Sequence, residues 1–445
     1  MKERAAALAL LLAVASRAAA DDWPQWRGPH GTGISTEKGI PARWGKEDVR
    51  WKVPVGGLGV SSPVVAGDRI FVTSQSGRGV RREGNHPKLA QGQEGSEEKP
   101  LGAAAGATPG DAPAVEFVVE AFQRKDGRRL WQYHFAAEGT LPPVHEKHNL
   151  ASPSPVTDGR LVYAWFGTGQ LVALDMDGKL AWQRHLGKEL GSFDINWGAG
   201  SSPALFGDLL FLLCYHEPRS YLLALDKGTG KERWKVDRGK DVRSYSTPVV
   251  FAGPKGDELV VNSTERLESY DPRTGELLWH AGGPHRFAIP VPTFDGSVLY
   301  ASRGYRSGPY MAIRPGGRGD VSESHVQWSV PTGAPYVSSL LYYDGLVYMA
   351  SDVGVVTCVD ARTGEKAWQE RIPGIFTASP VAAEGRVYLL SETGDAIVLR
   401  AGREARVLER SPLGFRMVAS PALSGRQVFI RTDEQLVSIG GGGDR

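Results

Sequence analysis

Residues that could bind a metal ion gather in one stretch of the chain, V-H-E-K-H-N-L. His145 and His148 stand three positions apart, with Glu146 between them. Imidazole nitrogens and carboxylate oxygens are common zinc ligands, but no further ligand is recognisable beside these three. Histidines in loops also act as solvated or capping residues. We therefore predict no metal site.

Polar residues that could line a ligand pocket occur in this loop and in a second one, F-D-I-N-W-G. The candidates are His148, Asn149, Asp194, Asn196 and Trp197. A Trp ring offers a flat surface on which a ligand can stack. Asn and Asp in loops also satisfy neighbouring backbone groups, and this alternative stays open. The sequence does not identify a ligand.

The sequence motifs of several common active sites are absent. The chain contains no G-x-S-x-G, no phosphate-binding P-loop and no H-E-x-x-H. The 56 glycines are spread over predicted turns, so none requires a phosphate to explain it. We therefore predict no catalytic residue.

The elements that position these loops come from a repeated motif. Its fullest copy is Leu223–Trp234, L-A-L-D-K-G-T-G-K-E-R-W, and further copies are Phe122–Trp131, Ala173–Trp182, Tyr270–Trp279 and Val359–Trp368. The Asp can bond its own turn backbone and the Gly supplies a positive φ, which is typical of a hairpin. Copies at intervals of about 40–50 residues indicate a repeat architecture.

A second recurring pattern marks the start of each unit. A Ser-Pro-like opening is followed by three short apolar runs, the Asp-Gly hairpin and the Trp strand. The openings are Ser61-Ser62, Ser154-Pro155, Ser202-Pro203, Thr247-Pro248, Val291-Pro292, Ser338-Ser339, Ser379-Pro380 and Ser420-Pro421. Alternating polarity and close Gly turns predict four strands in each unit, called A to D. Eight such units predict an all-β, eight-bladed propeller of antiparallel blades.

The two ends of the chain are expected to close the ring. The last unit, Ser420–Ile439, has three strands, and Arg50–Val55 can supply its fourth. Pairing the ends in this way removes exposed sheet edges. The propeller then occupies residues 21–445 as one domain, and residues 76–114, rich in Gly, Glu and Ala, form a mobile insertion in the first blade.

The first 20 residues have the pattern of a secretory signal. A basic start is followed by a short apolar core and by Ala18-Ala19-Ala20. The core is too short to span a bilayer, so we expect a soluble periplasmic or secreted protein without a transmembrane segment. No Cys follows the core, so no lipid anchor is expected. Cys214 and Cys358 lie in predicted strands of distant units, and we expect two buried thiols without a bridge.

The charge balance argues against one class of partner. The whole chain carries a formal net charge of +2. The predicted signal holds three basic residues and one acidic residue, so its removal leaves a net charge of zero. Nucleic-acid-binding proteins usually present a basic surface. We therefore expect no nucleic-acid partner.

The opening S-P-x-x-x-x-G-x-[VI]-[YF]-[VL] and the motif L-D-x-x-T-G-K-x-x-W resemble the quinoprotein-dehydrogenase-like propellers over roughly Arg50–Ile439. This superfamily includes pyrroloquinoline-quinone (PQQ) alcohol dehydrogenases and the non-catalytic propeller of the outer-membrane assembly machinery. The resemblance implies that the motif Trp docks one blade on the next. The residues that match are Trp131, Trp182, Trp234, Trp279 and Trp368.

The resemblance leaves two functions open. PQQ dehydrogenases hold their cofactor against a disulfide of adjacent cysteines and beside a calcium ion. This chain has no adjacent cysteines and no D-x-D-x-D calcium loop. We therefore favour a non-catalytic propeller that binds an envelope protein or a small molecule on its loop face. The alternative is a PQQ- and calcium-dependent oxidoreductase, with Asp194, Asn196 and Trp197 at the channel mouth.

Overall fold

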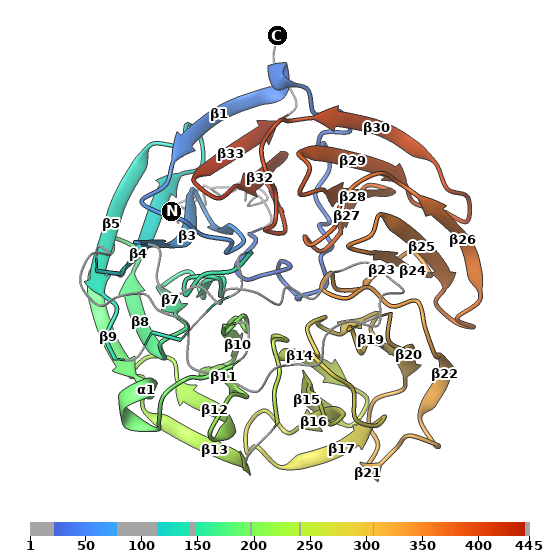
Figure 1. The fold of residues 1–445 in the computed structure, drawn as a ribbon, viewed down its shortest axis with the longest axis horizontal. Helices are drawn as coiled ribbons and strands as arrows, with labels where there is room; N and C mark the ends of the chain where they lie inside the picture. The colour runs from blue at the N-terminus through green and yellow to red at the C-terminus, as the bar shows by residue number, and fades with distance from the viewer. Residues whose placement is uncertain are drawn as a thin grey trace, which may run out of the picture.

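The chain folds into a ring of β-sheets in a computed structural model that describes residues 22–77, 114–139, 141–142, 144, 147–195, 198–239, 242–305 and 307–440. The predicted signal and most of the predicted insertion lie outside the described residues. Figure 1 looks down the ring and shows the sheets arranged around a common central axis.

The first four blades follow the chain, each with its inner strand first. Blade 1 contains β2 (Val64–Ala66), β3 (Arg69–Ser76), β4 (Glu116–Gln123) and β5 (Arg129–Ala136). Blade 2 contains β6 (Val156–Thr157), β7 (Leu161–Trp165), β8 (Gln170–Asp175) and β9 (Leu180–His185). Blade 3 contains β10 (Ala204–Phe206), β11 (Leu209–Cys214), β12 (Ser220–Asp226) and β13 (Glu232–Gly239). Blade 4 contains β14 (Val249–Gly253), β15 (Gly256–Asn262), β16 (Leu267–Tyr270) and β17 (Leu277–Ala281).

The other four blades complete the ring. Blade 5 contains β18 (Thr293–Phe294), β19 (Leu299–Ser302), β20 (Tyr310–Ile313) and β22 (Val326–Val330). Blade 6 contains β23 (Leu341–Tyr343), β24 (Leu346–Ala350), β25 (Val355–Asp360) and β26 (Lys366–Arg371). Blade 7 contains β27 (Val381–Ala383), β28 (Arg386–Leu390), β29 (Asp395–Arg400) and β30 (Val407–Pro412). Blade 8 contains β31 (Ala422–Ser424), β32 (Gln427–Arg431), β33 (Gln435–Gly440) and β1 (Val49–Pro54).

Ring closure by the chain ends is confirmed. Strand β1 pairs antiparallel with β33, from Val49 opposite Ile439 to Pro54 opposite Gln435. The predicted eight-bladed, all-β propeller is therefore confirmed as well. The helical elements of the described residues are a single turn, α1 (Leu186–Glu189), and the 3₁₀ turn η1 (Lys46–Asp48). None of the described helices is long and apolar enough to cross a membrane.

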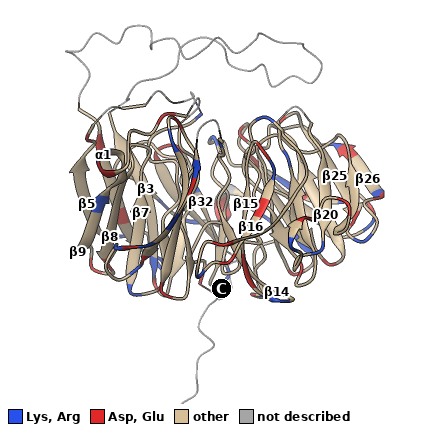
Figure 2. Cartoon of the chain, turned by 90° about the horizontal axis from the view of Figure 1, so that it is seen from below, with Lys and Arg blue, Asp and Glu red and all other residues tan. Residues whose placement is uncertain are grey.

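Burial explains why the outer strands alternate in polarity and the inner strands do not. Strand β11 is buried at every position, whereas the outer strand β22 alternates between half-buried and exposed residues. A strand between two neighbouring blades is covered on both faces, but an outer strand has one face in water. Figure 2 shows acidic and basic residues interspersed around the ring, as the near-zero net charge leads one to expect.

The Trp residues of six outer strands dock on the next blade. Each indole N–H donates to a backbone carbonyl in the β-turn between the third and fourth strands of that blade, at 2.8–3.1 Å. The pairs are Trp51 with Arg124, Trp131 with Met176, Trp182 with Lys227, Trp234 with Pro272, Trp328 with Ala361, and Trp368 with Gly402. A turn in one blade thus seats the Trp of the blade before it.

The turn glycine has a second role that the motif alone does not reveal. Gly230 has a φ of +70°, and an added Cβ would lie 2.6 Å from the Trp182 ring of the preceding blade. The same close approach occurs between Gly127 and Trp51 and between Gly178 and Trp131. The turn therefore needs glycine for two reasons. Its conformation has a positive φ, and a Cβ atom at this position would clash with the indole of the preceding blade.

Trp279 departs from the docking that the resemblance implies. It is fully buried, and its N–H donates to the Glu258 Oε2 atom of its own blade at 2.6 Å. The reason lies in blade 5, where a long connection replaces the tight turn between the third and fourth strands. That connection forms β21 (Gly319–Asp320), which pairs parallel with β17 beside Trp279. The sequence pattern did not predict this fifth strand on blade 4.

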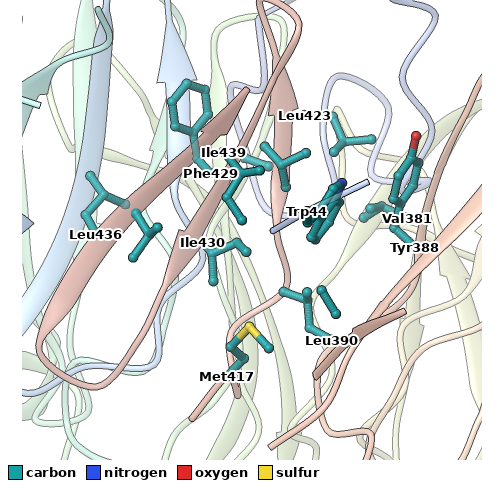
Figure 3. Packing of buried hydrophobic residues seen from close by; sticks show 14 of the residues in the cluster. Trp44, Val381, Tyr388, Leu390, Met417, Leu423, Phe429, Ile430, Leu436 and Ile439 are labelled. Carbon is teal, nitrogen blue, oxygen red and sulfur yellow. The ribbon is translucent and has the colours of Figure 1, made fainter. Parts of the chain in front are cut away.

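The largest hydrophobic cluster seals the closing blade. It joins blades 7, 8 and 1 with Trp44, which stacks on Tyr388 at a ring-centroid distance of 5.4 Å (Figure 3). Blade 7 is the blade whose outer strand has no Trp, and blade 8 has no hairpin to receive one because β33 and β1 are not consecutive. Cys214 and Cys358 are buried and unbridged, as predicted.

The seating of Trp on glycine can be tested with two alanine variants. Gly230 and Gly207 both have a positive φ, but an added Cβ at Gly207 meets nothing within 4 Å. We expect Gly207→Ala to cost about 1 kcal/mol of unfolding free energy through backbone strain. Gly230→Ala should cost roughly 2 kcal/mol more because the methyl group displaces Trp182. Urea unfolding measures both, and equal losses would contradict the docking role.

Candidate functional site

A ring of hydroxyl groups surrounds the central channel at the start of the inner strands. The backbone N–H of one blade donates to the Ser or Thr hydroxyl at the matching position of the next blade, at 2.9–3.0 Å. The donor and acceptor pairs are Ser62–Ser154, Ser154–Ser202, Ser202–Thr247, Val291–Ser339, Ser339–Ser379 and Ser379–Ser420. We call these eight residues, one from each blade, the channel ring. The opening predicted from the sequence is therefore a contact between blades as well as the start of a strand.

The channel ring encloses a cavity of about 230 Å³. Its apolar walls come from the residues next to the ring and from the connecting loops. The lining residues are Trp26, Val60, Ser62, Lys147, His148, Ser152, Ser154, Gly200, Ser202, Tyr245, Thr247, Ile289, Val291, Tyr336, Val337, Ser339, Thr377, Ser379, Val418, Ala419 and Ser420. No carboxylate stands among them within the described part of the chain. The cavity therefore presents apolar surface, hydroxyl groups, one ammonium group and one imidazole.

Trp26 forms the floor of this cavity. The segment that carries it begins beside blade 1, where Trp23 exchanges two backbone hydrogen bonds with Val65, and continues to blade 7, where Gly33 and Ser35 pair with Ala382. Figure 1 shows this blue segment passing through the centre of the ring before it turns outward to β1. It pairs with the inner strands at Val65 and Ala382, past the hydroxyl groups of Ser62 and Ser379, so Trp26 lines the cavity on the side away from the interblade loops.

Arg27 fixes the floor segment against blade 6. Its guanidinium is buried and donates from Nη2 to the carbonyl oxygens of Thr32 and Leu340, at 2.8 and 2.6 Å. Burial lowers the pKa of Arg27 to about 9. A buried charge without a carboxylate partner is costly. We therefore interpret Arg27 as a residue that holds the floor segment in place through its contacts with carbonyl oxygens.

The mouth of the cavity is formed by the loops that join one blade to the next. The Lys147 ammonium reaches across the mouth and lies 2.8 Å from the Glu392 Oε1 atom of blade 7. Arg416 lies 3.5 Å from the other oxygen of Glu392 and 2.9 Å from Asp433. The charges therefore alternate from Asp433 to Lys147, and the member that touches the cavity is a cation. Burial raises the pKa of Asp352, the carboxyl group on the neighbouring blade.

Aromatic side chains occupy the opposite side of the mouth. Phe287 contacts Tyr245 and Tyr305 at centroid distances of 6.4 and 4.9 Å, and Tyr305 packs edge-on against Tyr336 at 5.2 Å. Tyr245 and Tyr336 also line the cavity. These rings come from four different connections, so they hold the loops together around the opening.

The structure brings one of the sequence candidates to the cavity. His148 lies in its wall. Asn149 is buried, and its Oδ1 atom accepts the Ala151 N–H at 2.9 Å, so it stabilises its own loop. Asp194 exchanges backbone hydrogen bonds with Glu217 and is not a lining residue. Asn196 and Trp197, like His145 and Glu146, lie outside the described residues.

Sequence reasoning missed the floor and the channel ring. No sequence motif points to Trp26, because its place in the cavity depends on the path of the segment that precedes β1. The channel ring did have a signal in the sequence, because most openings carry a Ser or Thr directly before the Pro. The described residues contain no group of three or more His, Cys, Asp or Glu side chains that could hold a metal ion.

The sequence comparisons agree with this architecture. Residues 115–307 and 317–442 match the family described as outer membrane protein assembly factor BamB. The chain belongs to this family. BamB of Yersinia pestis is 22% identical over 287 residues, covering 60% of this chain and 68% of the relative. Tetrathionate hydrolase of Acidithiobacillus ferrooxidans is 24% identical over 292 residues, covering 61% of this chain. This chain spans about half of the hydrolase, 53% of its length.

Two kinds of solved structure share the fold of this BamB-family chain. BamB from Moraxella catarrhalis has a TM-score of 0.58 and 14% identity, covering 89% of this chain and 98% of that one. The quinohemoprotein alcohol dehydrogenase from Comamonas testosteroni has a TM-score of 0.64 and 13% identity, covering 95% and 81%. The fold therefore does not distinguish an assembly factor from an enzyme.

One of the two blade junctions that lack this hydrogen bond in the described structure, between Thr247 and Val291, can be tested by supplying a hydroxyl group. Val291 is the ring position without a hydroxyl, and the Thr247 N–H has no acceptor among the described residues. We expect Val291→Thr, which keeps the shape, to stabilise the protein by about 0.5–1 kcal/mol through a new hydrogen bond. Val291→Ala, the control, should destabilise it. Urea unfolding measures both, and a loss in Val291→Thr would contradict the role of the ring.

A buried histidine below the second loop gives a pH test. His216 packs against Phe193 at a centroid distance of 3.8 Å with the two rings tilted by 32°, and burial lowers the pKa of His216 to about 4. Because the unfolded chain takes up this proton near pH 6.5, stability is lost as the pH falls from about 6.5 to 4. His216→Phe should reduce that loss by up to roughly 3 kcal/mol. Urea unfolding across this range checks it, and identical slopes would refute the assignment.

Proposed function

We propose that this chain is an exported, non-catalytic propeller that binds a protein or another ligand on its loop face. The observation that carries the proposal is the cavity at the channel mouth, which Trp26 closes from below. The lining includes residues of the interblade loops, such as Lys147, Tyr245 and Tyr336, so the cavity adjoins the loop face. Ligand sites are typically concave and largely apolar with a few polar groups, as this cavity is.

Family membership supports a partner in the cell envelope. The matching family and the Yersinia pestis relative are both described as outer membrane protein assembly factor BamB. The signal-like pattern of residues 1–20 agrees with export to the same compartment. We therefore propose that the protein acts in the periplasm or outside the cell, with an envelope protein as its partner.

The alternative function is that of a PQQ-dependent oxidoreductase. The similarity to the Comamonas testosteroni enzyme and the Trp floor favour it. The residues present do not fit the calcium ion that accompanies the quinone, because the described lining offers no carboxylate and Asp194 lies elsewhere. Cys214 and Cys358 belong to blades 3 and 6, so they cannot form the disulfide of adjacent cysteines. We therefore derive no reaction step through a quinone.

A binding and activity assay separates the two functions. Purified protein from Asp21 onward is titrated with PQQ and calcium by calorimetry and then assayed for alcohol-dependent dye reduction. We expect neither saturable binding nor turnover. Calcium-dependent turnover would replace the binding proposal with the enzyme.

The loop face is tested by charge reversal. Arg286 is exposed on the connection between blades 4 and 5, and Arg160 is exposed on a turn of the opposite face. We expect Arg286→Glu to weaken capture of envelope proteins by immobilised protein several-fold and Arg160→Glu to leave capture unchanged. Capture that depends on Arg160 and not on Arg286 would place the partner on the other face and contradict the proposal.

A further inference from the structure

We infer that the channel-mouth cavity binds a small organic anion, with its carboxylate or other oxyanion group at Lys147 and the channel ring and its apolar body on Trp26. This inference rests on the proposed function, because it names what occupies the cavity of that loop face. It follows from the hydrogen-bonding state of the ring, from the charge of the walls and from the size of the cavity.

The hydroxyl groups of the ring supply unused donors. Ser154, Ser202, Thr247, Ser339, Ser379 and Ser420 each accept one backbone N–H, and in the described structure none of them donates to a protein acceptor. A hydroxyl that accepts one hydrogen bond still has its proton to donate. Ser62 also lines the cavity, and in the described structure its hydroxyl accepts no backbone N–H from the neighbouring blade. The cavity therefore offers several O–H donors to a group rich in acceptors.

The charge of the walls favours an anion over a cation. Lys147 contributes the positive charge that touches the cavity, and the described lining has no carboxylate to repel an anion. Behind Lys147, Glu392 lies 2.8 Å from the ammonium group and also contacts Arg416, which pairs with Asp433. These four charges balance, so a bound anion would share Lys147 with a carboxylate that stands outside the cavity lining. Hydrogen bonds to an ionised group are about twice as strong as neutral ones, so a carboxylate gains more here than an amide of the same shape.

The size and the apolar surface set the rest of the ligand. A dry cavity of roughly 150 Å³ holds one benzene molecule. The present cavity, at about 230 Å³, has room for a single-ring carboxylate. Trp26 below and Val60, Val337 and Val418 at the sides would cover its apolar body. An inorganic ion would leave this apolar surface without a partner.

The test compares benzoate with benzamide, which has the same shape and no charge. Calorimetric titration of the whole protein should show saturable binding of benzoate and at least tenfold weaker binding of benzamide. Lys147→Met should weaken benzoate about tenfold and change benzamide little, and Lys147→Arg should retain binding. Lys52→Met is the matched control, since Lys52 is exposed on the outer strand β1.

A second variant tests the ring without breaking a contact between blades. Ser62→Ala removes a cavity hydroxyl but keeps the Ser62 amide bond to Ser154, and we expect about threefold weaker benzoate binding. Equal affinity for benzoate and benzamide, an equal effect of Lys52→Met, or no binding at millimolar concentration would overturn the inference. If Arg286-dependent capture of an envelope protein persists without benzoate binding, the loop-face function stands and only the anion site is refuted.

Discussion

The pairing of β1 with β33 is the constraint on which the rest of the structure depends. Eight blades close into a ring only if the last blade takes its outer strand from the other end of the chain. In this chain the segment before β1 pairs with Val65 and Ala382 of the inner strands and then runs outward to the rim (Figure 1). The segment that makes this journey places Trp26 at the channel centre and Trp44 against Tyr388. Closure of the ring and the floor of the cavity are therefore consequences of one path.

The departures from the repeat follow from the same physical rules as the repeat itself. A Trp docks where the next blade has a tight turn with a glycine beneath the indole. Blade 8 has no such turn, because β33 and β1 are not consecutive, and blade 7 accordingly lacks the Trp. Blade 5 replaces the turn with the connection that forms β21, and Trp279 bonds to Glu258 instead. Each exception in one blade is thus explained by its neighbour.

The fold could be predicted from sequence because its signals are local and repeated. The Asp-Gly hairpin, the Ser-Pro opening and the Trp strand each lie within about a dozen residues, and the repeat count sets the blade number. The site could not be read in the same way. Its lining converges from Trp26 to Ser420, and nothing local distinguishes His148, which faces the cavity, from Asn149, which bonds its own loop. Convergence is a property of the closed ring, not of any one loop.

The channel ring joins stability to binding through the same atoms. Each hydroxyl that accepts an N–H across a blade junction also faces the cavity. When a hydroxyl donates its proton to a bound acceptor, its oxygen becomes a better acceptor, because hydrogen bonds in a chain polarise one another. A ligand with oxygen acceptors at the channel centre would therefore strengthen several blade junctions at once.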